Sequence, residues 1–173
     1  VIYINPQTAT IDTTTLIQGF KITNGGNVAK GGGLFIKNCS PMISNVLIHS
    51  NQSNDIGGGI FYNALNSKAI LKNSDILSNS SKDGGGIGQE GAGYPDTLII
   101  TNVRFKENSS SDKGGGLHTR NNTVIEIHSS LFSNNSSVND GGGIYAYYTS
   151  ITCKNTQFYD NEGSSTGKGG GLY

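Results

Sequence analysis

Two charged residues at matching positions of successive repeats are the first candidates for chemistry. Asp75 and Arg104 each stand one residue before the apolar residue of a repeated column. If the repeats stack, the carboxylate and the guanidinium point outward side by side. Polysaccharide lyases and glycoside hydrolases need acidic and basic groups that converge on one face in this way. The interpretation that we favour is a cross-coil ion pair on a solvated surface.

The other groups that an enzyme would need are scattered or missing. His49, His118 and His128 fall in three different columns, with no carboxylate at a fixed position beside them. The chain has no tryptophan, so it lacks the Trp-Ile-Asp-His signature of pectate lyases, and it has no adjacent Asp-Asp pair. We therefore predict no catalytic residues. A polysaccharide lyase or glycoside hydrolase of pectate-lyase-like fold remains the alternative function.

Carboxylates also recur shortly before four of the glycine triplets, as Asp55, Asp83, Asp112 and Asp140. Stacked carboxylates and amide carbonyls are ligands that suit Ca²⁺. Their distances from the glycines differ, however, and lysines occupy the same places in other repeats. We expect a solvated turn of mixed charge and predict neither a metal site nor a cofactor, with Ca²⁺ as the alternative.

A column of aromatic residues is the surface feature most suggestive of binding. It lies one residue after the Leu or Ile that follows each triplet, and alternation along a strand points it outward. The rings can stack on one another and stabilise the sheet, which we favour, or they can present their faces to a sugar or a protein. The candidate binding residues are Phe35, Phe61, His118, Tyr145, Tyr147 and Tyr173.

A repeat of 26 to 30 residues sets the framework for all these side chains. Three glycines followed by Leu or Ile begin at positions 31, 57, 84, 114, 141 and 169. Two further apolar columns have the same period. They are Ile17, Ile43, Leu71, Ile100, Ile127 and Cys153, followed five residues later by Ile22, Ile48, Ile76, Phe105, Phe132 and Phe158.

No single repeat can bury its own apolar residues, so the repeats must stack to form a continuous core. Apolar neighbours two residues apart indicate strands, and no stretch has helical spacing. We predict an all-β fold, a right-handed parallel β-helix of about six coils with three short strands per coil. The handedness follows from the preference for right-handed crossovers between parallel strands. Residues 1–173 would form one domain, a segment of a longer solenoid.

Several columns have structural roles in this fold. Asn45, Asn73, Asn102 and Asn155 lie where a sharp bend is needed, and asparagine tolerates left-handed backbone angles. A second asparagine column, at 51, 79, 108, 135 and 161, is interpreted as the exit turn, and stacked amides in both columns can form hydrogen-bonded ladders along the helix axis. The glycine triplets permit positive φ and close approach of coils. An outward apolar stripe of Leu16, Met42, Ile70 and Ile99 suggests that something covers it.

Composition excludes two classes of partner. The chain carries 12 Lys+Arg and 12 Asp+Glu, and its formal net charge is zero. Without a basic cluster we predict neither nucleic-acid binding nor binding to an anionic membrane surface. No apolar run reaches the length of a membrane helix, so we also predict no membrane insertion by this segment. Cys39 and Cys153 lie several coils apart, too far to pair.

The motifs Phe105-x-x-Asn108, Phe132-x-x-Asn135 and Phe158-x-x-Asn161, each followed by Gly-Gly-Gly-[Ile/Leu], resemble the FxxN and GGA-[ILV] repeats of chlamydial polymorphic outer membrane proteins. They are equally similar to repeats of right-handed β-helix surface proteins of other bacteria. The resemblance covers roughly residues 17–173. It departs from the family in its third glycine, and in Ile48 and Ile76 where Phe would stand.

The resemblance implies an extracellular or cell-surface location in a bacterium. It also implies a non-enzymatic role as a surface adhesin or stalk, similar to an autotransporter passenger. A side face would bind a glycan or a protein of a host or neighbouring cell. Further coils or a capping domain of the same chain are the other expected partners.

Overall fold

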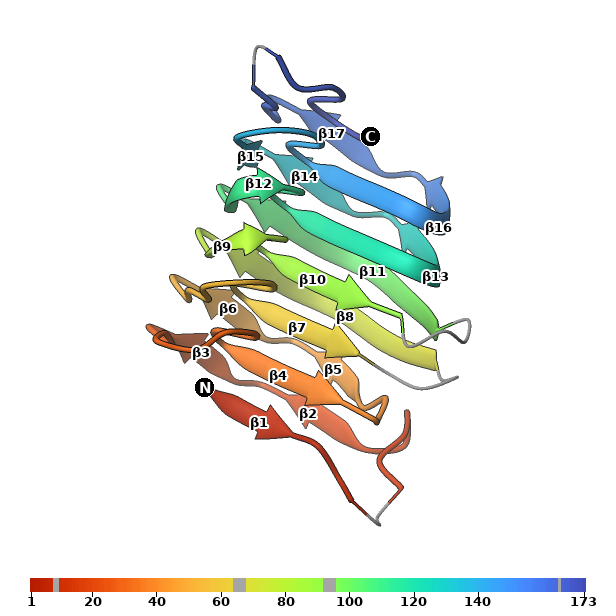
Figure 1. Cartoon of the computed structure of the whole chain (residues 1–173). Helices are drawn as coiled ribbons and strands as arrows, with labels where there is room; N and C mark the ends of the chain where they lie inside the picture. The colour runs from red at the N-terminus through yellow and green to blue at the C-terminus, as the bar shows by residue number, and fades with distance from the viewer. Residues whose placement is uncertain (8–9, 64–67, 92–95, 165) are drawn as a thin grey trace.

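The computed structural model is a parallel β-solenoid of about five turns, close to the expected six coils (Figure 1). It describes residues 1–7, 10–63, 68–91, 96–164 and 166–173, and every regular element within them is a strand. The two termini lie at opposite ends of the stack, the N-terminus near the lower end and the C-terminus near the upper end in Figure 1. No described segment forms a helix that could span a membrane.

Three faces surround the core. The triplet face, directly after the glycines, contains β1 (Ile2–Ile4), β4 (Leu34–Lys37), β7 (Ile60–Asn63), β10 (Ile87–Glu90) and the first parts of β13 (Leu117–His128) and β16 (Ile144–Lys154). The central face contains β2 (Leu16–Gln18), β5 (Met42–Ser44), the first parts of β8 (Lys68–Leu77) and β11 (Asp96–Lys106), and the later parts of β13 and β16. The third face contains β3 (Lys21–Thr23), β6 (Leu47–His49), β14 (Leu131–Ser133), β17 (Gln157–Tyr159) and the later parts of β8 and β11.

The coils differ from the predicted three short strands in two respects. Four strands, β8, β11, β13 and β16, run through a bend and serve two faces each. A fourth short segment, β9 (Ser80–Asp83), β12 (Ser109–Lys113) and β15 (Ser136–Ser137), forms a separate three-stranded sheet before the glycine corner. Serine and lysine carry no strong strand signal, and these strands form because neighbouring coils supply their hydrogen-bond partners.

The predicted apolar columns are confirmed, since their members pair coil to coil in register. Ile43 pairs with Leu71, Ile100 with Leu71 and Ile127. On the third face, Phe105 pairs with Ile76 and Phe132, and the two rings stack with centroids 4.3 Å apart. These side chains are buried and form one continuous core. Cys153 completes the column opposite Ile127 but is exposed, and both cysteines are free, as predicted.

The bend before the third face has the expected backbone. Asn45, Asn73, Asn102 and Asn155 have φ values of 51°, 49°, 53° and 51°. The second asparagine column behaves differently from its prediction as an exit turn. Positive φ falls one residue earlier, at Ser50, Ser78, Glu107, Asn134 and Asp160, and most of the asparagine side chains turn into the core.

Inside the core, the second asparagine column forms a continuous amide ladder. Asn79 Nδ2 donates to Asn108 Oδ1 at 3.1 Å and to the Ile48 carbonyl at 3.0 Å. Asn108 repeats this pattern with Asn135 and Ile76. Asn79 and Asn108 are completely buried, so each amide must be satisfied by the coils beside it. The ladder therefore fixes both the spacing and the register of the coils.

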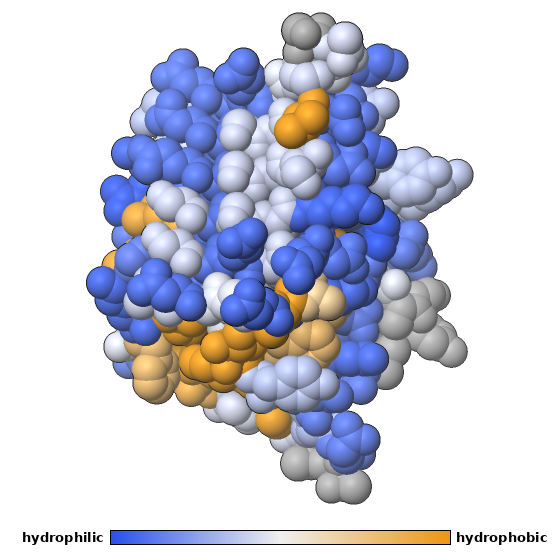
Figure 2. Space-filling view, turned by 60° about the vertical axis from the view of Figure 1, so that its left-hand side comes forward, coloured by the Kyte–Doolittle hydropathy of each residue, from blue (hydrophilic) through white to orange (hydrophobic). Residues whose placement is uncertain are grey.

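The glycine triplets also have both predicted properties. The first glycine of each triplet has a φ between 63° and 74°. The second has no room for a side chain: a Cβ at Gly115 would lie 2.5 Å from the Gly142 carbonyl oxygen. Figure 2 shows a largely hydrophilic surface on this side of the molecule and a hydrophobic patch toward its N-terminal end.

The apolar stripe on the central face is in register as predicted. Leu16 pairs with Met42, Met42 with Ile70, and Ile99 with Ile70 before the column becomes polar at Glu126. Leu16 is exposed, whereas the other three are half-buried. What covers the stripe stays a prediction.

Candidate functional site

The aromatic column forms two separate stacks on the triplet face. Tyr3, Phe35 and Phe61 stack with centroid distances of 4.5 and 5.1 Å. His118, Tyr145 and Tyr173 form the second stack, at 5.2 and 5.5 Å. Gly88 occupies the same column between the two stacks and interrupts it. The expected stacking is therefore present, except at this coil.

The expectation that the column is open to solvent is wrong for its central members. Phe61, His118 and Tyr145 expose only 3%, 2% and 7% of their surface, whereas Tyr147 and Tyr173 expose 50% and 43%. Phe35 is half-buried. The rings point away from the core as alternation requires, but a second layer of side chains lies over them.

In three coils the covering side chain comes from the residue just before a glycine triplet. Lys30 Nζ lies over the Phe61 ring, 4.9 Å from its centroid, and Lys113 Nζ lies 5.0 Å from that of Tyr145. In both cases the lysine covers the ring of the following coil, because the glycine corner turns the chain back onto the triplet face. Ile56 has the same relationship to Gly88. Cation–π contact and burial thus make much of the column structural.

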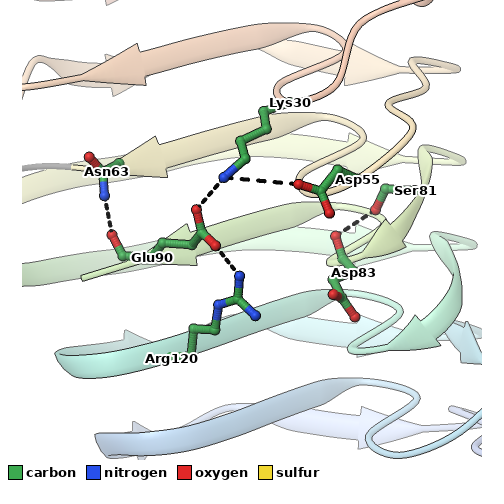
Figure 3. A network of polar contacts seen from close by, with 7 residues as sticks. All are labelled: Lys30, Asp55, Asn63, Ser81, Asp83, Glu90 and Arg120. Carbon is green, nitrogen blue, oxygen red and sulfur yellow. Dashed lines mark hydrogen bonds and ion pairs between the residues drawn. The ribbon is translucent and has the colours of Figure 1, made fainter. Parts of the chain in front are cut away.

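An ion-pair network ties four coils together beside this layer (Figure 3). The Glu90 carboxylate accepts hydrogen bonds from Lys30 Nζ, at 2.5 Å, and from Arg120 Nη2. Lys30 Nζ also lies 4.0 Å from Asp55 Oδ2. Burial on its own would raise the pKa of Glu90, but the hydrogen bonds and charges of Lys30 and Arg120 outweigh it and lower that pKa. Glu90 is therefore held ionised and Arg120 is held in place.

Arg120 borders a charged cleft that contains three of the predicted binding residues. We define the charged cleft by its lining residues, which are Lys82, Asp83, Asp112, Lys113, His118, Arg120, Asn121, Tyr145 and Tyr147. They come from β9, β12, β13 and β16, whose parallel register brings three successive coils to one place. Phe35, Phe61 and Tyr173 lie outside the cleft lining.

Two nitrogen atoms of the cleft residues, His118 Nδ1 and Arg120 Nε, are buried and form no hydrogen bond within the described part of the chain. Burial, with smaller contributions from the positive charges of Arg120 and Lys113, lowers the pKa of His118 to about 4. Burial also raises the pKa of Asp83, and the negative charge of Asp112 adds to this rise. The cleft thus combines a neutral imidazole with cations, carboxylates and an exposed ring.

Asp75 and Arg104, the first candidates for chemistry, lie on the third face. Arg104 Nε and Nη2 donate to Asp75 Oδ1 and Oδ2 at 3.0 and 2.8 Å, an arrangement in which both groups satisfy each other. The pair lines an open groove along the bend, together with the exposed Asn45, Asn73 and Asn102. This geometry is that of the favoured cross-coil ion pair.

The carboxylates considered for Ca²⁺ bind groups of the protein instead. Asp83 and Asp140 accept hydrogen bonds from the backbone N–H groups of Lys113 and Lys168, and Asp112 accepts one from Asn139 Nδ2. Within the described residues no three His, Cys, Asp or Glu side chains are grouped so that they could hold a metal ion. Calcium binding stays untested.

Sequence reasoning missed Asp83, Asp112, Lys113 and Arg120 as neighbours of the aromatic residues. The prediction did not include the offset of one coil. Because of this offset, the residue before one glycine triplet contacts the aromatic position that follows the next triplet. The sequence contains a signal for this offset. A lysine precedes the triplet one coil before Phe61 and before Tyr145, and the large Ile56 stands one coil before the small Gly88.

Comparison with known proteins identifies the repeat. Residues 102–120 and 129–147 match the family model of the Chlamydia polymorphic membrane protein (Chlamydia_PMP) repeat. Each matched segment runs from the bend residue through the third face and the glycine corner to the triplet face, and it ends at Arg120 or Tyr147 of the charged cleft. No curated protein and no solved structure shows significant similarity to the chain.

Proposed function

Because the chain carries Chlamydia polymorphic membrane protein-like repeats on a parallel β-solenoid, we propose that it is a non-enzymatic module of a bacterial surface protein. In this role it acts as a rigid stalk or adhesin, outside the cell, and contacts a glycan or a protein through a side face. The one-domain organisation over residues 1–173 and the presence of further coils or a capping domain remain part of the proposal.

The observation that carries this proposal is the regular pairing of the coils, whose described register shifts only between Ser110 and Lys113 and between Arg120 and Thr123. Backbone pairing, the buried amide ladder and the aligned glycine triplets repeat from coil to coil with the same partners. A solenoid whose coils pair in this way holds its side faces in fixed positions. Rigid display of a surface is what a stalk or an adhesin requires.

One observation favours a second candidate, a glycoside hydrolase. Asp83 and Asp112 lie in the same cleft, and the pKa of Asp83 is raised by its burial and by the charge of Asp112. A carboxyl with a raised pKa beside an ionised one is the arrangement that glycosidases use for general acid catalysis. We place it second because Asp83 is already engaged by the Lys113 backbone N–H.

A binding screen separates the two candidates. The immobilised chain would be exposed to a panel of oligosaccharides and extracellular proteins, and the retained ligand would be eluted and analysed by mass spectrometry. The proposed function predicts saturable retention of an intact ligand. Retention of nothing would overturn the binding role, and recovery of cleaved sugar would overturn the non-enzymatic role.

A further inference from the structure

We propose that the charged cleft is a binding site for one neutral pyranose unit of a glycan. The inference rests on the proposed surface function and gives it a site and a ligand class. Among the open hollows of the described surface, this cleft combines carboxylates, cations and an exposed aromatic ring. The serine-lined groove over β9, β12 and β15 has no aromatic residue in its lining. The bend groove has the same kinds of groups, including the exposed Phe20, but its Asp75 and Arg104 already satisfy each other.

The hydrogen-bonding groups of the cleft suit sugar hydroxyls, which donate and accept at once. The carboxylates of Asp83 and Asp112 are acceptors, and only one oxygen of each is engaged by a protein donor within the described residues. Lys82 supplies an exposed ammonium donor. A vicinal pair of hydroxyls can donate to one carboxylate and accept from a nearby cation. The cleft offers both partners.

Two buried nitrogen atoms would gain a partner from such a ligand. His118 Nδ1 and Arg120 Nε have none within the described residues. A buried polar atom without a hydrogen bond costs free energy, and a hydroxyl recovers that cost once the side chains that cover the atom move aside. Glu90 holds the Arg120 guanidinium in place, and the same carboxylate also binds Lys30.

An exposed ring provides the apolar contact that a pyranose needs. Tyr147 is 50% exposed at the cleft border, and Tyr148 packs edge-on against it with centroids 4.4 Å apart. This T-shaped contact restrains the Tyr147 ring and leaves half of the side-chain surface exposed. The C–H groups of one face of a sugar ring can pack on an aromatic surface of this kind.

The charges favour a neutral sugar over an acidic one. Lys82, Lys113 and Arg120 are balanced by Asp83, Asp112 and by Glu90, which binds Arg120. The buried imidazole of His118 adds no charge at neutral pH. A uronate or a sialic acid would therefore meet no net attraction, because repulsion by the carboxylates offsets attraction by the cations.

The test is a glycan array that carries matched neutral and acidic oligosaccharides, probed with the wild-type chain, Tyr147→Ala and Asp112→Asn. The matched controls are Tyr159→Ala and Asp160→Asn, which change exposed residues of the same types outside the cleft. Melting temperatures of all five proteins show that each is folded. We expect binding to neutral sugars, weakened about tenfold or more in the cleft variants and unchanged in the controls.

The other outcomes are also decisive. Equal binding by all five proteins would overturn the cleft as the site while leaving the proposed surface function intact, since another face would then bind. A preference for acidic sugars that weakens steeply with salt would overturn the ligand class. Absence of any glycan binding by the wild-type chain would overturn this inference and leave only protein ligands for the proposed function.

Discussion

The side chain of Ile56 occupies the space that a side chain at Gly88 would need. A Cβ placed on Gly88 would overlap Ile56 and lie 2.8 Å from the Gly57 backbone nitrogen, and Ile56 itself is fully buried. At the equivalent pairs, Lys30 covers Phe61 and Lys113 covers Tyr145. The residue before one triplet and the aromatic position of the next coil therefore form a complementary pair.

This pairing predicts coupled effects of mutation. Gly88→Ala should cost about 1–3 kcal/mol of unfolding free energy through overpacking, and Ile56→Ala about 2–5 kcal/mol through the cavity that it leaves. In the double variant the overlap with the Ile56 side chain is gone, although the close contact with the Gly57 nitrogen stays, so the total should be at least about 1 kcal/mol smaller than the sum. Urea unfolding of the four proteins measures the coupling. Additive costs would show that the two residues do not share this space.

The buried amide ladder should be among the most sensitive features of the molecule. Asn108→Ala removes the donor to the Ile76 carbonyl and Asn135 Oδ1, and it leaves Asn79 without its acceptor. Several buried groups lose their partners at once, so we expect a loss of about 3–5 kcal/mol in urea unfolding.

The matched control is Asn102→Ala on the exposed bend column. Asn102 donates one hydrogen bond, to Asn73 Oδ1, and has a φ of 53°. Asn102→Ala should therefore lower the free energy of unfolding by only about 1 kcal/mol. Similar costs for the two variants would contradict a structural role that is specific to the buried ladder.

The second glycine of a triplet should tolerate no side chain. At Gly115 a Cβ would lie 2.5 Å from the Gly142 oxygen and 2.7 Å from the Ser136 carbonyl carbon, both backbone atoms that cannot move aside. Gly115→Ala should cost more than about 4 kcal/mol or prevent folding. Gly26→Ala is the control, because its Cβ would meet only the Gln52 oxygen, at 3.9 Å. Circular dichroism melting that finds both variants equally stable would refute the close approach of the coils.

His118 should make the chain less stable in mild acid. Its pKa is about 4 in the folded chain and 6.5 ordinarily, so below pH 6.5 the unfolded chain binds a proton that the folded chain excludes. The unfolding free energy should fall as the pH drops from about 6.5 to 4. Below about pH 4, protonation of His118 should cause no further fall. The difference of 6.5 − 4 = 2.5 units sets an upper limit of about 3 kcal/mol.

Replacement by a non-titrating ring isolates this effect. His118→Phe keeps an aromatic partner for Tyr145 and should remove the loss between pH 6.5 and 4. His128→Gln, a half-exposed control, should keep it. Urea unfolding at four pH values compares the three proteins, and an unchanged pH dependence in His118→Phe would contradict the assignment.

The fold followed from periodicity because stacked repeats put identical positions on top of one another. Ile43, Leu71, Ile100 and Ile127 pair as their spacing predicts, and the bend asparagines have the expected left-handed backbone. Turn chemistry and strand alternation act within a few residues, so one sequence contains enough information to locate them.

The solvent exposure of the aromatic column could not be predicted from the sequence pattern, because it depends on a contact between coils. Alternation gives the direction of the His118 and Tyr145 side chains but says nothing of the residues that lie over them. Hydrogen bonding between stacked asparagine amides was predicted, but its place inside the core, at Asn79 and Asn108, was not, since asparagine suits both a solvated turn and a buried ladder. Both outcomes depend on which side chains the neighbouring coil places against these residues.

The most direct test of the central claim, that this solenoid binds a sugar at its side face without cleaving it, is calorimetric titration with the neutral glycan that the array selects. The account predicts one saturable site in the wild-type chain, loss of the signal in Tyr147→Ala, and a recovered glycan of unchanged mass. A recovered glycan shortened by the wild-type chain but not by Asp83→Asn would contradict the account and identify the cleft as that of a hydrolase.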